Sequence, residues 1–221
     1  MLALGLVDRV RHGHYVIRPL GVLGTPSTAE EVSLAVGAAF KNIPHRIGYR
    51  SALDEHDLIV HPARTIQVAA SKTIRAKSLS GQALRLIREP ESSISIGAIK
   101  CGESWVSDLE RSLLDAARRP KLIGGAEVLA QAVTAAAAEI DSEKLTRYAI
   151  DLDWPSAIRR LGSLADALKL PNLSGTLLPI HAIRADLDLE PGTKTKTAWR
   201  DSRWHLRWSQ SIEELAAVTE Q

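Results

Sequence analysis

The feature that most constrains the fold is a change in the spacing of apolar residues along the chain. Short stretches typical of strands come first, a run of helical patterns with short connections follows from Ser107 to Leu168, and strand-like stretches then return. The strands that we expect lie at 65–69, 84–88, 94–99, 177–184, 186–190 and 199–208. This order, without regular strand–helix alternation, predicts an α+β fold with a central helical run.

Several helix starts are marked by capping residues or by proline. Residues 48–56 are expected to form a short helix that presents Tyr49, Ala52 and Leu53. The expected starts are Ser27 with Glu30, Ser107 with Glu110, Asp141, Pro155, and Ser211 with Glu214. An expected hairpin joins 94–99 to Ser104–Val106 through Cys101-Gly102-Glu103.

Composition sets broad limits on the function. The chain has 221 residues, 45% of them hydrophobic and 24% charged, and a formal net charge of +2, so the whole-chain charge does not indicate nucleic-acid binding. A single cysteine, Cys101, excludes an intrachain disulfide and a multi-cysteine metal site. Apolar runs are shorter than the ~18 residues of a membrane span, and no signal peptide is evident. We therefore expect a cytoplasmic protein without a membrane partner.

The sequence lacks the common catalytic motifs. It contains no phosphate-binding loop, no Gly-x-Ser-x-Gly elbow, no His-Glu-x-x-His pair and no acidic residue two before a lysine. We expect neither an enzyme nor a cofactor. An alternative is a metal-dependent enzyme acting on nucleotides or nucleic acid, because alternation places Asp186, Asp188 and Glu190 on one strand face. The same residues also suit the solvent face of an edge strand.

Basic residues gather in two places. The first is a predicted hairpin around His12-Gly13-His14, whose candidate DNA-binding residues are Arg9, Arg11, His12, His14 and Arg18. The second is a candidate nucleic-acid or partner surface formed by Lys194, Lys196, Arg200, Arg203 and Arg207. Three tryptophans, Trp199, Trp204 and Trp208, alternate with these cations. They suit either stacking on bases or a strand with tryptophans inward and arginines outward.

Several stretches, taken in order, resemble the AbiEi antitoxins, which regulate abortive-infection toxin–antitoxin systems. The resemblance covers nearly the whole chain. It rests on Gly5-Leu6-Val7 with Arg11-His12-Gly13-His14-Tyr15, Gly48-Tyr49-Arg50-Ser51-Ala52-Leu53, Trp105-Val106-Ser107-Asp108-Leu109-Glu110-Arg111-Ser112-Leu113-Leu114-Asp115, Gly124-Gly125 with Glu127-Val128, and Ala157-Ile158-Arg159-Arg160-Leu161-Gly162.

The resemblance implies a transcriptional autorepressor and antitoxin with two parts. Residues 1–20 would be the end of a winged-helix DNA-binding domain, and 21–221 the antitoxin domain that neutralises a nucleotidyltransferase-like toxin, directly or functionally. Operator DNA is then an expected partner, and RNA an open one. The sequence departs from the family because the helices before the wing are missing. If Met1 is the true start, sequence-specific operator binding is in doubt, because a wing alone reads few bases.

The stretch from Trp105 to Asp115 also has an ordinary structural interpretation. Leu109, Leu113 and Leu114 have the spacing of a helix core, and Arg111 and Asp115 are placed to pair on the helix surface. We therefore predict that this stretch is structural and not an active site.

Overall fold

A computed structural model describes residues 7–11, 14–17, 29–180, 185–189, 197–211 and 214–215. The fold is α+β, as the order of patterns predicts. The chain divides into two compact units, the first made of Met1–Glu55 and Pro62–Asp108 and the second of His56–His61 and Leu109–Gln221. The predicted domain boundary after residue 20 lies outside the described residues. Within the described ranges, no helix has the length and apolar content that crossing a membrane requires.

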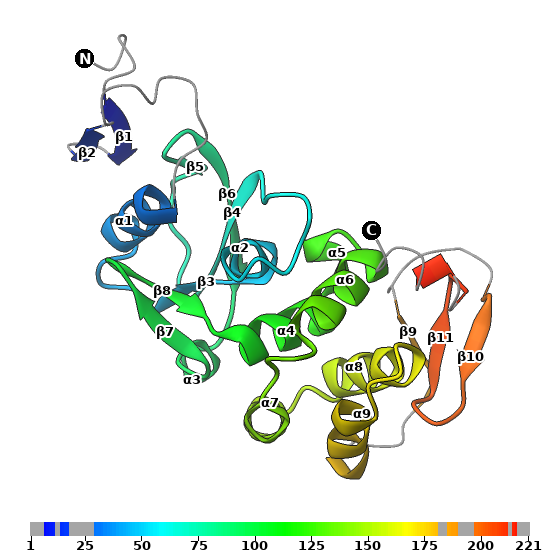
Figure 1. Cartoon of the computed structure of the whole chain (residues 1–221). Coiled ribbons are helices and arrows are strands. Elements are labelled where there is room, and N and C mark those ends of the chain that lie inside the picture. The colour runs from blue at the N-terminus through cyan, green and yellow to red at the C-terminus, as the bar shows by residue number, and fades with distance from the viewer. Residues whose placement is uncertain are drawn as a thin grey trace. The chain divides into compact units, whose positions relative to one another are not determined.

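The first unit is built on a mixed six-stranded sheet with the order β5–β6–β4–β3–β8–β7 (Figure 1). Its strands are β3 (His45–Ile47), β4 (Thr65–Ala70), β5 (Ser78–Leu79), β6 (Gln82–Arg88), β7 (Ala98–Cys101) and β8 (Ser104–Ser107). β3 runs parallel to β8 and antiparallel to β4, and β4 runs parallel to β6. A separate antiparallel hairpin, β1 (Val7–Arg11) with β2 (His14–Ile17), also belongs to this unit.

The helices of the first unit are α1 (Ala29–Ala39), α2 (Tyr49–Glu55) and α3 (Glu91–Ile94). The face of α1 with Ala35, Val36 and Phe40 packs into a core with Ile47 and Val106. The predicted helix at 48–56 is confirmed as α2, and all three residues that it was expected to present are fully buried. Gly37 lets α1 approach the β7–β8 turn, because a Cβ there would lie 2.2 Å from the carbonyl oxygen of Glu103.

A buried ion pair joins the strands and α2 of the first unit. The Arg46 guanidinium lies 2.9 Å from the Glu89 carboxylate, and both side chains are inaccessible to solvent. Tyr49 donates a 2.6 Å hydrogen bond from its hydroxyl to the same carboxylate. Ser107, at the end of β8, accepts a hydrogen bond from Arg46 and donates one to the carbonyl of Ile47. One carboxylate and one guanidinium thus connect β3, α2, β8 and the end of β6.

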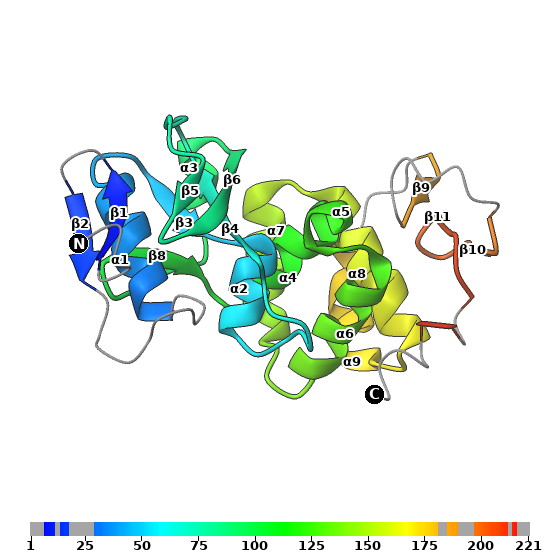
Figure 2. The same cartoon turned by 90° about the horizontal axis from the view of Figure 1, so that it is seen from above.

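The second unit is a helical bundle that carries a small sheet. Its helices are α4 (Leu109–Arg118), α5 (Pro120–Ile123), α6 (Ala126–Ala136), α7 (Ser142–Leu152), α8 (Pro155–Ala167), α9 (Pro171–Leu177) and the 3₁₀ turn η2 (Leu178–Ile180). Both views place α4 and α8 side by side (Figure 2), and these two helices share the most extensive contact of the unit. The cap predicted at Asp141 is confirmed, because its carboxylate accepts from the amide of Lys144.

The small sheet of the second unit has the order β10–β11–β9. Its strands are β9 (Leu187–Asp188), β10 (Trp199–Asp201) and β11 (Leu206–Trp208). β10 and β11 are antiparallel, and β9 runs parallel to β11. After the sheet, Ser211 and Glu214 exchange the two reciprocal hydrogen bonds of a capping box, as predicted.

Three strand predictions are wrong in part. Residues 94–99 contain the end of α3 before β7 begins at Ala98. The stretch 177–184 begins with the end of α9 and η2, where Pro171 starts a helix that the apolar run alone did not indicate, and 181–184 lie outside the described residues. The expected strand 199–208 is a hairpin, because Asp201 accepts from the amides of Arg203 and Trp204 and so closes a turn.

Replacing Glu89 with leucine will lower the free energy of unfolding by about 3–5 kcal/mol, because Arg46 is left as a buried cation without its carboxylate. Glu91→Gln is the matched control: Glu91 is exposed, so the change will stay within about 0.5 kcal/mol. Urea unfolding followed by circular dichroism measures both. Equal losses in the two variants would show that the pair does not hold the unit together.

Candidate functional site

The basic hairpin forms with the pairing that the sequence predicts. In the register, Arg9 lies opposite Tyr15 and Arg11 lies opposite His14, with an irregularity between Arg9 and Arg11. β1 contacts α1 and β5 of the same unit. His12 and Arg18 lie outside the described residues. The backbone therefore brings three of the five predicted DNA-binding residues into one short hairpin.

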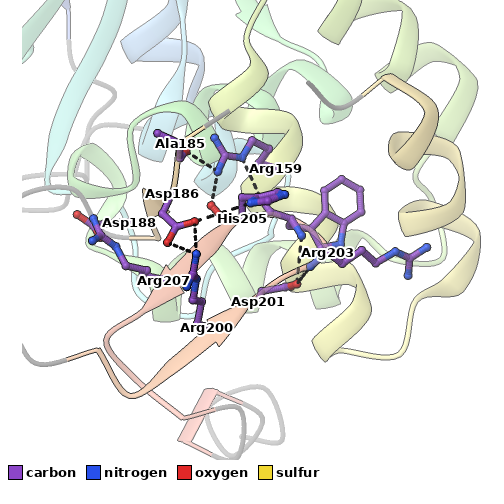
Figure 3. Close-up of polar contacts among 10 residues, drawn as sticks. Arg159, Ala185, Asp186, Asp188, Arg200, Asp201, Arg203, His205 and Arg207 are labelled. Carbon is purple, nitrogen blue, oxygen red and sulfur yellow. Dashed lines mark hydrogen bonds and ion pairs between the residues drawn. The ribbon is translucent and has the colours of Figure 1, made fainter. Parts of the chain in front are cut away.

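The C-terminal candidate surface is the outer face of the small sheet (Figure 3). Arg200 lies directly opposite Arg207 on the neighbouring strand, and Arg207 lies beside Asp188 on the next one. Arg200 and Arg207 are 64% and 44% exposed. Lys194 and Lys196 lie outside the described residues. Like charges opposite each other on a sheet repel, so this row needs nearby anions.

Three carboxylates supply those anions. Arg200 lies 2.8 Å from Asp186, Arg207 lies 2.8 Å from Asp188, and Arg203 lies 3.0 Å from Asp166. Exposed pairs of this kind contribute only about 0–1 kcal/mol each, so an external phosphate can compete for the arginines. The carboxylates weighed as metal ligands, Asp186 and Asp188, are engaged with these arginines. The described residues contain no group of three or more acidic, histidine or cysteine side chains able to hold a metal ion.

Two of the three tryptophans in this region are buried, and the third, Trp199, is half-buried. Trp204 and Trp208 are fully buried, and Trp199 packs edge-on against Trp208 at 5.1 Å. The indole nitrogen of Trp204 donates a 2.7 Å hydrogen bond to Asp166. The indole nitrogen of Trp208 donates a 2.9 Å hydrogen bond to Ser163. Of the two alternatives left open by the sequence, the arrangement matches tryptophans inside and arginines outside. Trp204 and Trp208 therefore cannot stack on bases in this arrangement.

Two consecutive buried arginines of α8 anchor the sheet. Arg159 donates to the main-chain carbonyls of Trp204, Ala185 and His205 (Figure 3). Arg160 donates to the carbonyls of Asp188, at 3.0 Å, and Ala117, at 2.9 Å. Burial, aided by the neighbouring charge of Arg159, lowers the pKa of Arg160 to about 10, so it remains a cation at neutral pH. These side chains bind protein carbonyls.

The stretch from Trp105 to Asp115 is also engaged in internal contacts. Arg111 and Asp115 pair at 2.9 Å as expected, but both are fully buried, so placing them on the surface was wrong. The reason is that α4 is buried on nearly all sides and its charges must be paired inside. Glu110 forms an ion pair with Lys144 at 2.7 Å and accepts a hydrogen bond from the amide of Asp141 at 3.0 Å. Arg111 also lies over the ring of Trp154 at 4.6 Å, on which Arg118 stacks as well.

Sequence reasoning missed a cavity of about 470 Å³ in the first unit. Its lining comes from four places in the chain: the α1–β3 turn with Lys41 and Asn42, β3 with His45, the α3 region with Glu91 and Ile94, and the β7–β8 hairpin with Ala98 and Trp105. Trp105 is 41% exposed between buried neighbours on β8. The one sequence feature that could have indicated this cavity was a tryptophan at a solvent-facing position of a predicted strand.

His45, in the cavity wall, is held in place by both ring nitrogens. Nδ1 lies 2.8 Å from the carbonyl oxygen of Ile43, and Nε2 lies 3.1 Å from the hydroxyl of Ser104. Burial lowers the pKa of His45 below its usual value of 6.5, since the charged form would lose its hydration. The ring also stacks on Phe40 at 5.2 Å. His45 is therefore a neutral structural group at pH 7.

Comparison with known proteins identifies the fold and not the function. No protein-family model matches the chain, and no curated protein does. Among solved structures, the chain is similar to the RV2827C protein from Mycobacterium tuberculosis, with a TM-score of 0.69. The match covers 99% of this chain and 80% of that chain at 16% identity. At this identity, the likeness supports a shared fold alone.

Replacing Gly162 with alanine will destabilise the second unit by about 1–3 kcal/mol, because the new Cβ would lie 2.2 Å from the ring of Trp204. Gly175→Ala is the control, since nothing lies within 4 Å of its Cβ and alanine favours a helix. Thermal unfolding will show a lower midpoint for the first and an equal or higher one for the second. An unchanged midpoint for Gly162→Ala would mean that α8 and the small sheet are not closely packed.

Proposed function

We propose that the chain is an antitoxin-type regulator that binds its own promoter DNA and neutralises a nucleotidyltransferase-like toxin in the cytoplasm. The observation that carries the proposal is that the stretches resembling AbiEi antitoxins also contain the main internal contacts of the structure. The stretches that resemble AbiEi antitoxins, Trp105–Asp115 and Ala157–Gly162, contain the side chains that hold this fold: Arg111 with Asp115, Arg159, Arg160 and Gly162.

The contacts favour binding over catalysis as the mode of action. The conspicuous polar clusters of both units are engaged in ion pairs and main-chain hydrogen bonds. The register of the β1–β2 hairpin brings Arg9, Arg11 and His14 together on one short element. Arginines on a hairpin suit contacts with the phosphate backbone, which position a protein on DNA. We propose that this hairpin is the wing.

Growth of cells that express the proposed partner, a nucleotidyltransferase-like toxin, tests the antitoxin function. Co-expression of this chain will restore growth. The double variant Arg9→Ala/Arg11→Ala will still restore it, because the substitutions fall in the hairpin and leave the antitoxin domain intact. Failure of the unaltered chain to restore growth would contradict the antitoxin assignment.

Fluorescence anisotropy on the chain's own promoter fragment, across about 50–200 mM salt, tests the DNA-binding function. We expect the affinity for DNA to fall steeply as the salt concentration rises. The double variant Arg9→Ala/Arg11→Ala will bind about tenfold more weakly, and the slope of log affinity against log salt concentration will be smaller by about two. Arg64→Ala/Arg75→Ala, two exposed arginines of the same unit outside the hairpin, is the matched control. Equal losses in both double variants would show that the hairpin is not the DNA-contacting element.

A further inference from the structure

We infer that the cavity beside Trp105 binds a nucleotide, with the base against Trp105 and the phosphate held by Lys41 and Lys100. The proposal goes beyond the antitoxin function and does not depend on it. The volume of the cavity, about 470 Å³, is within the range of small-molecule sites. No function described above uses this cavity.

The wall of the cavity offers an aromatic surface for a flat ring. Trp105 is 41% exposed, although it lies on a strand between buried Ser104 and Val106. Ile43, Pro44 and Ile94 add apolar surface around it. Any nucleic-acid base has a π-face that can stack on an indole, so this wall suits a base without selecting one.

One lysine that lines the cavity, Lys41, and one that lies beside Trp105 outside the lining, Lys100, suit an anion near the indole ring. Lys100 lies opposite Trp105 in the β7–β8 pair, with its ammonium nitrogen 5.5 Å from the centre of the indole ring. Lys41 is exposed and lines the cavity, and none of the described residues forms an ion pair with it. Two ammonium groups near one aromatic wall match a ligand that is flat at one end and anionic at the other.

Polar groups at the rim suit the edge of a base. The side-chain amide of Asn42 can both donate and accept hydrogen bonds, and the Glu91 carboxylate can accept from an exocyclic amino group. His45 adds no charge to repel or attract the ligand, because burial lowers the pKa of its ring. An uncharged apolar ligand would leave both lysines unused, so the charges favour a nucleotide over an aromatic side chain of a partner protein.

Isothermal titration calorimetry of the whole chain with adenosine 5′-monophosphate tests the inference. We expect saturable binding, with adenosine and ribose 5-phosphate each binding about tenfold more weakly. Trp105→Ala will weaken binding about tenfold, and Trp105→Phe, which retains a ring, will keep most of the affinity. Lys41→Gln and Lys100→Gln will each weaken binding several-fold and flatten its salt dependence. Ile99→Ala is the control, because Ile99 is exposed on the same hairpin and does not line the cavity.

Several outcomes would overturn the inference. The first is that no binding occurs at up to about 10 mM nucleotide. The second is that the Trp105→Ala and Ile99→Ala variants bind the nucleotide with equal affinity, and the third is that adenosine binds as tightly as its monophosphate. Indole-3-propionamide binding as tightly as the nucleotide would assign the cavity to an apolar side chain instead. Pentadeoxyadenylate distinguishes the two sources of the same chemistry: tighter binding than the mononucleotide assigns the cavity to a nucleotide within a strand, and equal binding to a free one.

Discussion

The burial of arginine side chains is the interaction on which both units depend. Arg46, Arg111, Arg159 and Arg160 are each less than 5% exposed. Taking a guanidinium out of water costs several kcal/mol, so each must be surrounded by acceptors. Arg46 and Arg111 pair with carboxylates, and Arg159 and Arg160 donate to main-chain carbonyls. Because the acceptors of Arg46, Arg159 and Arg160 come from other segments, each of these three arginines fixes several parts of the chain at once.

Burial separates the basic residues of the protein into two groups with different roles. The buried arginines bind acceptors within the protein. Arg200, Arg203 and Arg207 are exposed and pair with nearby carboxylates, and the arginines of the β1–β2 hairpin lie on a short two-stranded element. The exposed arginines of the small sheet are therefore accessible to an anionic partner. Net charge conceals this division, because +2 averages over cations that solvent does not reach.

The sequence predicts the fold well where a local signal is strong. Helix α2 with its three buried residues, the caps at Asp141 and Ser211, and the β7–β8 hairpin all follow from short-range patterns. The prediction failed where tertiary packing decides. The apolar stretch at 177–184 begins in helix α9, and the Arg111–Asp115 pair is buried, because neighbours far along the chain cover α4.

The candidate sites were predictable to different degrees. The N-terminal hairpin was visible because its residues are consecutive, and the C-terminal basic residues were visible because they cluster in the sequence. The placing of Arg200 opposite Arg207 was not predicted, because it arises from the β10–β11 hairpin and not from a single strand. The partners of that row were not predicted, since Asp186 and Asp188 were considered as metal ligands and Asp166 comes from α8. The cavity beside Trp105 is lined by four segments that are far apart in the sequence. The spacing of residues within a segment does not predict that such segments come into contact.

The buried arginines hold the fold, and the exposed arginines of the small sheet do not. Urea unfolding of Arg160→Met beside Arg200→Met tests this within one unit. We expect Arg160→Met to lose about 3 kcal/mol or more, because buried carbonyls of Asp188 and Ala117 lose their donor. Arg200→Met should change the free energy of unfolding by less than about 1 kcal/mol. Similar losses in the two variants would contradict the account.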